Sequence, residues 1–183
     1  MAHSTGAYNI RQVVESDWNA VSTIYRAMLT DAPTAFGETI QEIEQRTDSD
    51  WKSLVAQWSE GSRAVAFIAE DAAGYCGFVR ADTTDPRTPP GTVLVSNLWT
   101  APRQRGRGLG RVLMNTVEQW ARGHQAERIA LGVTEENHTA FGFYSALGYQ
   151  DTGRRAPAGS DPHRTVSVLA KALTPATADR GTA

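Results

Sequence analysis

The sequence predicts an α/β (α+β) protein with one mixed sheet flanked by helices, and two kinds of pattern support that class. Apolar residues recur at helical spacing in residues 18–28 and again in residues 109–122. Short apolar or alternating runs indicate strands at residues 8–14, 64–69, 75–81, 92–100, 128–134 and 165–171, with one more beginning at Tyr149. Because several strands come first and strands then alternate with helices, a mixed sheet is expected.

The segments between these elements are less regular. Residues 38–44 form an acidic helical stretch, and residues 50–58 continue it or form a third helix. Residues 70–74 have the composition of a hairpin turn, and residues 137–147 that of a short helix. Residues 155–162 are rich in glycine, proline and serine, so a loop is expected there before the closing strand.

Composition and charge exclude several classes of protein. The 183 residues suit a single domain, expected at residues 7–172 between disordered tails at 1–6 and 173–183. A net charge of −2 gives no bulk attraction to nucleic acid or to a membrane. No stretch reaches the ~18 apolar residues of a membrane span. The single cysteine, Cys76, excludes an intrachain disulfide, so a cytoplasmic protein is expected. The expected oligomeric state is a monomer or a homodimer. No metal is expected, because no group of His, Cys and carboxylates has ligand spacing.

Residues 98–111 carry the candidate chemistry, since they run from a strand through a glycine-rich turn into an amphipathic helix. The first turn of such a helix has backbone N–H groups without internal partners, and its dipole favours negative charge. Gly106, Gly108 and Gly110 would leave those amides open to a phosphate. Arginines that can add charge-assisted hydrogen bonds crowd into the same stretch, namely Arg103, Arg105, Arg107 and Arg111. The segment therefore predicts a pyrophosphate site.

Three other interpretations of this loop compete. A dinucleotide-binding fingerprint requires G-x-G-x-x-G, whereas the spacing here is G-x-G-x-G. A Walker loop requires Gly-Lys-Ser/Thr, and the absence of a lysine or hydroxyl residue disfavours a nucleotide triphosphatase. A solvated arginine-rich turn would need no ligand.

Two motifs resemble the signatures of GNAT acetyltransferases. Residues 105–110, Arg-Gly-Arg-Gly-Leu-Gly, are similar to the R/Q-x-x-G-x-G/A signature between a strand and a helix. Residues 137–149, with Asn137, Ala140, Phe143-Tyr144 and Gly148-Tyr149, are similar to the N-x-x-A-x-x-L/F-Y-x-x-x-G-F segment. With the order of elements, the resemblance covers about residues 7–172. It implies a GNAT-like, mostly antiparallel sheet of six to seven strands with about four helices, and an acetyl-coenzyme A-dependent N-acetyltransferase.

The resemblance also implies a place for the coenzyme, between the strands at residues 92–100 and 128–134. The pantetheine arm would pair with the backbone of Leu98, Trp99 and Thr100. The other cofactor-binding residues implied are Arg105, Gly106, Arg107, Gly108, Leu109, Gly110, Arg111, Asn137, Phe143 and Tyr144. Tyr144 would also be the general acid that protonates the departing thiolate. By local pattern alone, Asn137 is a helix N-cap, and Phe143 and Tyr144 are core residues.

The sequence departs from the family where relatives commonly carry a glutamate base. Those two positions are Asn97 and Gly132, and neither side chain can accept a proton from the attacking amine. We expect Ser96 and Asn97 to position a water that carries the proton away. Other candidates for the base are Glu38, Glu135 and Glu136. A non-catalytic acyl-coenzyme A sensor is the alternative from a different class of protein.

The acceptor side of the site is expected between residues 33–44 and residues 155–164. Phe36 offers an apolar contact there, and Glu38 offers a carboxylate that could hold an ammonium group. These residues predict a small-molecule amine as acceptor, over a protein N-terminus or a lysine. A run of carboxylates at helical spacing is also typical of a solvated helix face.

Overall fold

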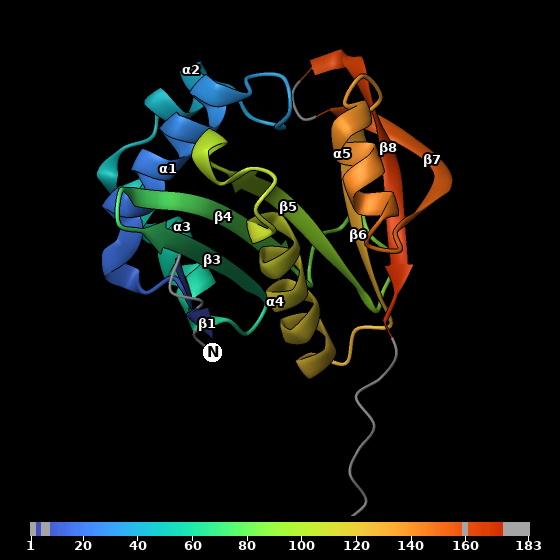
Figure 1. Cartoon of the computed structure of the whole chain (residues 1–183), viewed down its shortest axis with the longest axis horizontal. Helices are drawn as coiled ribbons and strands as arrows, with labels where there is room; N and C mark the ends of the chain where they lie inside the picture. The colour runs from blue at the N-terminus through green and yellow to red at the C-terminus, as the bar shows by residue number, and fades with distance from the viewer. Residues whose placement is uncertain (1–2, 5–7, 159–160, 174–183) are drawn as a thin grey trace, which may run out of the picture.

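The computed structural model describes residues 3–4, 8–158 and 161–173, and its centre is one eight-stranded sheet (Figure 1). The described strands lie in the order β1-β2-β3-β4-β5-β6-β8-β7. Among them, β5 and β6 are parallel and every other neighbouring pair is antiparallel. The mixed, mostly antiparallel sheet predicted from the sequence is therefore confirmed, with seven strands beside the two-residue β1.

The elements of the described chain have the following bounds. The strands are β1 (His3–Ser4), β2 (Asn9–Gln12), β3 (Ala64–Asp71), β4 (Gly74–Asp82), β5 (Thr92–Thr100), β6 (Arg128–Thr134), β7 (Gln150–Ala158) and β8 (Asp161–Ala172). The α-helices are α1 (Trp18–Asp31), α2 (Ile40–Glu44), α3 (Asp48–Glu60), α4 (Leu109–Gly123) and α5 (His138–Ser145). Short 3-10 turns at Glu15–Asp17 and Pro102–Gln104 precede α1 and α4.

The two expected tails are described only at their inner ends. His3–Ser4 pair with β2, so this part of the expected N-terminal tail belongs to the sheet. Leu173 is buried, and its N–H donates to the carbonyl of Glu127 at 2.8 Å. The rest of both tails, residues 1–2, 5–6 and 174–183, lies outside the described residues, and the domain limits stay a prediction.

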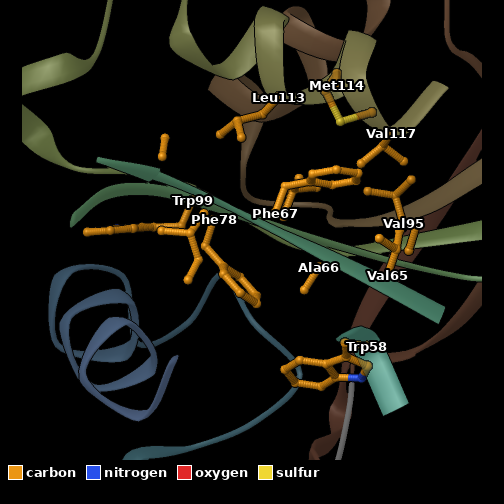
Figure 2. Close-up of a cluster of buried hydrophobic side chains, with 14 of the residues drawn as sticks. Trp58, Val65, Ala66, Phe67, Phe78, Val95, Trp99, Leu113, Met114 and Val117 are labelled. Atoms are coloured by element: carbon orange, nitrogen blue, oxygen red, sulfur yellow. The ribbon is translucent and has the colours of Figure 1, made fainter. Parts of the chain in front are cut away.

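Helices cover both faces of the sheet, because neighbouring residues of β4 point in opposite directions. On one face Gly77 lies against α4, so closely that an added Cβ would stand 2.9 Å from a Leu113 methyl. On the other face the Phe78 ring meets Tyr25 of α1, with centroids 5.5 Å apart, and Trp58 of α3 at 6.2 Å. Figure 2 shows both layers, with the α4 side chains on one side of the strands and Trp58 on the other.

The apolar stripe of α4 anchors that helix on the sheet. Its members are fully buried, at 0% exposure: Leu109, Leu113, Met114, Val117 and Ala121. Removing this much apolar surface from water is the main force that holds the helix in place. The packing fixes the first turn of α4 at the end of β5, where the candidate pyrophosphate loop lies.

Strands β5 and β6 are joined over only part of their length. Their parallel register pairs residues 92–95 with residues 128–131. Beyond that point β5 continues beside β4, and β6 continues beside β8. Within the described chain, the edge of β5 that faces β6 therefore has no strand partner over residues 96–100. The two strands diverge where the resemblance places the coenzyme.

A buried carboxylate links α4 to the C-terminal part of the sheet. Glu118 is 3% exposed, and Lys171 of β8 donates to its two oxygens at 2.8 and 2.9 Å. The Tyr149 hydroxyl donates to the same carboxylate at 3.2 Å, and Arg122 donates at 3.3 Å. A buried charge is tolerated only when it is paired and hydrogen-bonded, so these contacts hold the layers in register.

The expected loop at residues 155–162 is wrong. Strand β7 continues to Ala158, and β8 begins at Asp161. Antiparallel pairing with β8, such as Arg155 with Ser167 and Pro157 with Thr165, holds this polar segment extended. Since β7 is an edge strand, its proline and its exposed polar residues do not interrupt the sheet.

No helix within the described residues is both long enough and apolar enough to cross a membrane.

Candidate active site

A cavity opens where β5 and β6 diverge, and we call it the first cavity. Its lining includes Ser96, Asn97 and Leu98 of β5, and Gly132 of β6. The loop between α1 and α2 contributes Phe36, and the N-cap and last turn of α5 contribute Asn137 and Tyr144. The structure thus brings Ser96, Asn97 and Tyr144, predicted to act in catalysis, together with Asn137 and with Phe36, one of the two predicted acceptor residues.

A β-bulge turns β5 into this cavity. Phe78 of β4 pairs with Trp99, and Arg80 pairs with Ser96, so Asn97 and Leu98 stand opposite a single β4 residue. Asn97 has φ 57°, the left-handed conformation that asparagine tolerates better than most residues. Ser96 accepts a long hydrogen bond, 3.4 Å, from Arg80. The bulge explains why consecutive β5 residues line the same cavity.

Tyr144 lines the first cavity and is buried, at 9% exposure. Its ring lies edge-on between Phe143 and Tyr149, with centroids 5.1 and 5.8 Å away. Burial raises the pKa of its hydroxyl, because removal from water penalises the phenolate. Among the described residues the hydroxyl has no hydrogen-bond partner. The phenol therefore keeps its proton and can donate it to a group that enters the cavity.

The glycine-rich loop has the shape predicted for a phosphate cradle. Gly106 and Gly108 have φ 71° and 85°, and an added Cβ at either would meet no atom within 4 Å. The intrahelical bonds of α4 begin with the N–H of Val112, which donates to Gly108. No acceptor in the described chain binds the N–H groups of residues 109–111. Open backbone and unpaired amides at one helix start fit a pyrophosphate.

Gly108→Val is expected to weaken coenzyme A binding about tenfold. A β-branched residue at φ 85° is strained by about 1–2 kcal/mol, and its side chain would stand beside the open amides. Isothermal titration calorimetry measures the effect. Gly123→Val is the matched control, since Gly123 lies at the other end of α4 with nothing within 4 Å of an added Cβ. Equal affinities in the two variants would contradict a role for this loop.

The arginines near the loop fall into two groups. Arg103 is bound to Asp71 and to the carbonyls of Gly74 and Tyr75, so it supports the β3–β4 turn. Its guanidinium holds the pKa of the Asp71 carboxyl well below its usual range. Arg107 and Arg111 are exposed and have no partner within the described residues, so they remain available to an anion.

Asp31 is a residue of this region that the sequence did not single out. It ends α1, and one of its oxygens accepts from the Trp99 indole at 2.9 Å and from Arg105. Arg105 is separated from Asp31 by 74 positions, so no local pattern could reveal the pair. The contact joins the loop that follows α1 to the start of the glycine-rich loop.

Asn137 and Phe143 have structural contacts as well as a place in the site. The Asn137 side chain accepts from the N–H of Ala140 at 3.0 Å, so it is the N-cap of α5 while lining the first cavity. Phe143 packs against α4, where its ring would stand 3.3 Å from a Cβ added at Gly110. Gly110 therefore allows α5 to approach the glycine-rich end of α4 closely.

The structure separates the two predicted acceptor residues. Phe36 lines the first cavity, whereas Glu38 is absent from its lining and forms an ion pair with Arg46. Glu38 is therefore not a free carboxylate facing the acceptor. Arg46 lies between α2 and α3, with its guanidinium over the ring of Trp51. Sequence spacing alone did not reveal this pair.

A second cavity lies beside the first. Ala35, Thr134 and Asn137 line both, and Glu136 and Arg164 line the second alone. Arg164 of β8 donates to the carbonyl of Thr34, which links β8 to the α1–α2 loop. In Figure 1 this loop and the start of β8 lie at the same end of the molecule. Because they share three lining residues, the two cavities lie side by side, and we call them together the cleft.

No cysteine chemistry or metal chemistry is supported by the described residues. Cys76 is buried, and burial raises the pKa of its thiol to about 11, so it stays protonated and unreactive. No group of three or more His, Cys, Asp or Glu residues in the described part of the chain could hold a metal ion.

A strand edge left open by diverging strands, a glycine-rich helix start and a buried tyrosine are together typical of acyl-coenzyme A-dependent acyltransferases. The chain belongs to the Acetyltransferase (GNAT) family, whose profile matches residues 21–149. It is 28% identical over 143 residues to mycothiol acetyltransferase of Tsukamurella paurometabola, covering 76% of this chain and 47% of that protein. It is 34% identical over 82 residues to N-alpha-acetyltransferase RimI of Mycobacterium tuberculosis, covering 45% of this chain and 48% of that protein.

These alignments span about half the length of each relative. Among solved structures, spermidine N-acetyltransferase from Vibrio cholerae, in complex with CoA and spermine, superposes with a TM-score of 0.70. The superposition covers 93% of this chain and 98% of that chain at 16% identity, which supports a shared fold.

Proposed function

We propose that this chain transfers an acetyl group from acetyl-coenzyme A to the primary amine of a small molecule. The observation that carries the proposal is Tyr144, a buried, protonated phenol that lines the first cavity together with Ser96 and Asn97 of β5. The glycine-rich loop that follows β5 leaves open backbone amides at the start of α4. Relatives with acetyltransferase names and the family profile support the reaction type.

Each part of the site has a task in this proposal. The amides of residues 109–111, with Arg107 and Arg111, hold the pyrophosphate. The free edge of β5 over residues 96–100 pairs with the pantetheine arm of coenzyme A, whose amide groups follow the pyrophosphate. When bound, acetyl-coenzyme A supplies the thioester whose carbonyl the amine attacks. Tyr144 donates its proton to the departing sulfur, while Ser96 and Asn97 orient a water beside the attacking nitrogen.

The bridge over the opening supports a small acceptor. Arg164 reaches the carbonyl of Thr34 across the acceptor side, and Phe36 narrows the first cavity from the same loop. A protein N-terminus would need an open groove for its following residues. The spermidine N-acetyltransferase with the same fold carries spermine, a small polyamine. RimI, by its name an N-alpha-acetyltransferase, supports the competing choice of a protein N-terminus.

Coenzyme A should raise the melting temperature of the protein by about 5–10 °C when present at ~100 times its Kd. Preferential binding to the native state is worth about 2.7 kcal/mol at that ratio. Differential scanning fluorimetry measures the shift, with NAD as the control ligand. A shift with NAD and none with coenzyme A would overturn the assignment of the cofactor.

Turnover separates the enzyme from an acyl-coenzyme A sensor. Thiol release from acetyl-coenzyme A is followed with polyamines, aminoglycosides, amino acids and peptides offered as acceptors. A small amine is expected to give the highest kcat/KM. Preference for peptides would replace the small acceptor by a protein N-terminus, and thiol release with none of them would favour the sensor.

A further inference from the structure

The first cavity contains no base. Ser96 and Asn97 can relay a proton or orient a water, but neither side chain is basic enough to accept a proton from the amine. Gly132 has no side chain. Most amines arrive protonated at neutral pH, and an ammonium cannot attack a carbonyl. The proton must therefore pass to another group that lines the cleft or to bulk water.

Two of the three glutamates that remain as candidates for the base form ion pairs with arginines. Glu38 is bound to Arg46 and is absent from the lining of both cavities. Glu135 accepts from Arg155 of β7 at 2.8 Å and is also absent from both linings. Both carboxylates therefore have structural partners and neither faces the acceptor.

Glu136 is in a different position from its neighbour. It lines the second cavity, which shares the lining residues Ala35, Thr134 and Asn137 with the first. Within the described residues it has no ion pair and no hydrogen bond, and its side chain is exposed. Among the lining residues of the cleft, Glu136 is the carboxylate and Arg164 the cation.

Building on the proposed function, we infer that Glu136 is the general base of the reaction and binds the ammonium group of a cationic acceptor. Its carboxylate attracts the ammonium to the second cavity and takes one proton from nitrogen, directly or through one water. The neutral amine then advances to the first cavity. Glu136 directly precedes Asn137, the N-cap of α5 that lines both cavities, so its backbone is held at the edge of the cleft.

The protons balance in two steps. The first leaves the ammonium nitrogen for Glu136 and later passes to solvent. The second leaves nitrogen as the C–N bond forms and the C–S bond breaks, and it replaces the proton that Tyr144 gives to sulfur. The products are the N-acetyl amine, coenzyme A with a free thiol and one proton in solution. No oxidant, reductant or metal is needed.

Glu136→Gln tests the inference, and Glu135→Gln is the matched control from the adjacent position. Glu136→Gln is expected to lower kcat/KM for the amine about 10²-fold near neutral pH, while Glu135→Gln stays close to wild type. The deficit should shrink as pH rises, because more of the amine is already neutral in solution. Binding of coenzyme A, measured by calorimetry, should be unchanged in both variants. Binding of the amine to the coenzyme A complex should be weaker in Glu136→Gln alone.

The outcomes distinguish this inference from the proposed function. Equal pH profiles and equal amine affinity in wild type and Glu136→Gln would overturn the role of Glu136 and leave the acetyl transfer intact. An equal loss in both variants would assign the effect to the β6–α5 turn and would also overturn it. Wild-type protein that binds coenzyme A but acetylates no amine would remove the proposed function, and the base with it.

Discussion

Tyr144→Phe is expected to lower kcat by ~10²-fold or more while the affinity for coenzyme A stays the same. The hydroxyl is the only part removed, and the ring keeps its edge-on contacts with Phe143 and Tyr149. Without a proton donor the sulfur must leave as a thiolate, so the loss falls on the chemical step. Burial raises the pKa of this phenol, so the hydroxyl is protonated before the transfer begins.

Single-turnover kinetics with acetyl-coenzyme A and the best amine measure that step directly. Tyr75→Phe is a suitable control, since Tyr75 lies on β4 and does not line the cleft. If chemistry is rate-limiting and kcat is unaltered in Tyr144→Phe, Tyr144 is a packing residue and the general acid lies elsewhere.

Lys171→Met is expected to have the second large effect, a loss of about 3 kcal/mol in the free energy of unfolding. The substitution leaves the 3%-exposed Glu118 without its closest partner, and Tyr149 and Arg122 can compensate only in part. Methionine replaces the aliphatic stem, so little packing is lost. A loss of this size lowers the melting temperature by about 6–12 °C.

A double-mutant cycle checks the cause. Combining Lys171→Met with Glu118→Gln removes the charge that the first change leaves unpaired, so the double variant should recover much of the lost stability. Additive losses in urea denaturation would show that the two side chains stabilise the fold independently.

Much of the site could be predicted because it depends on local pattern. The strand at Thr92–Thr100, the strand at Arg128–Thr134 and the start of α4 at Leu109 lie where the sequence predicts them. Alternation, helical periodicity and the glycine spacing are each set within a few residues. The cavity residues of β5 and α5 followed from these elements and from two short motifs.

The remainder depended on contacts between distant residues. Neither the pair of Asp31 with Arg105 nor the bridge from Arg164 to Thr34, 130 positions apart, leaves a periodic signal. The same holds for Glu135 and Glu136, adjacent in sequence but differing in partner and placement. The second half of β7, residues 155–158, was expected to be a loop, because its extended conformation comes from pairing with β8 rather than from its own composition.

The divergence of β5 from β6 has a consequence for how such a protein evolves. The strand edge at residues 96–100 and the helix start at residues 109–111 offer main-chain groups, which every amino acid other than proline provides alike. Substitutions can accumulate there without loss of the donor site, provided that the strand keeps its course and the glycines remain. The cleft, in contrast, is lined by side chains such as Phe36 and Glu136, so each exchange there alters its shape or charge. A fold of this kind can therefore keep its main-chain groups in place while the side chains of its cleft diverge.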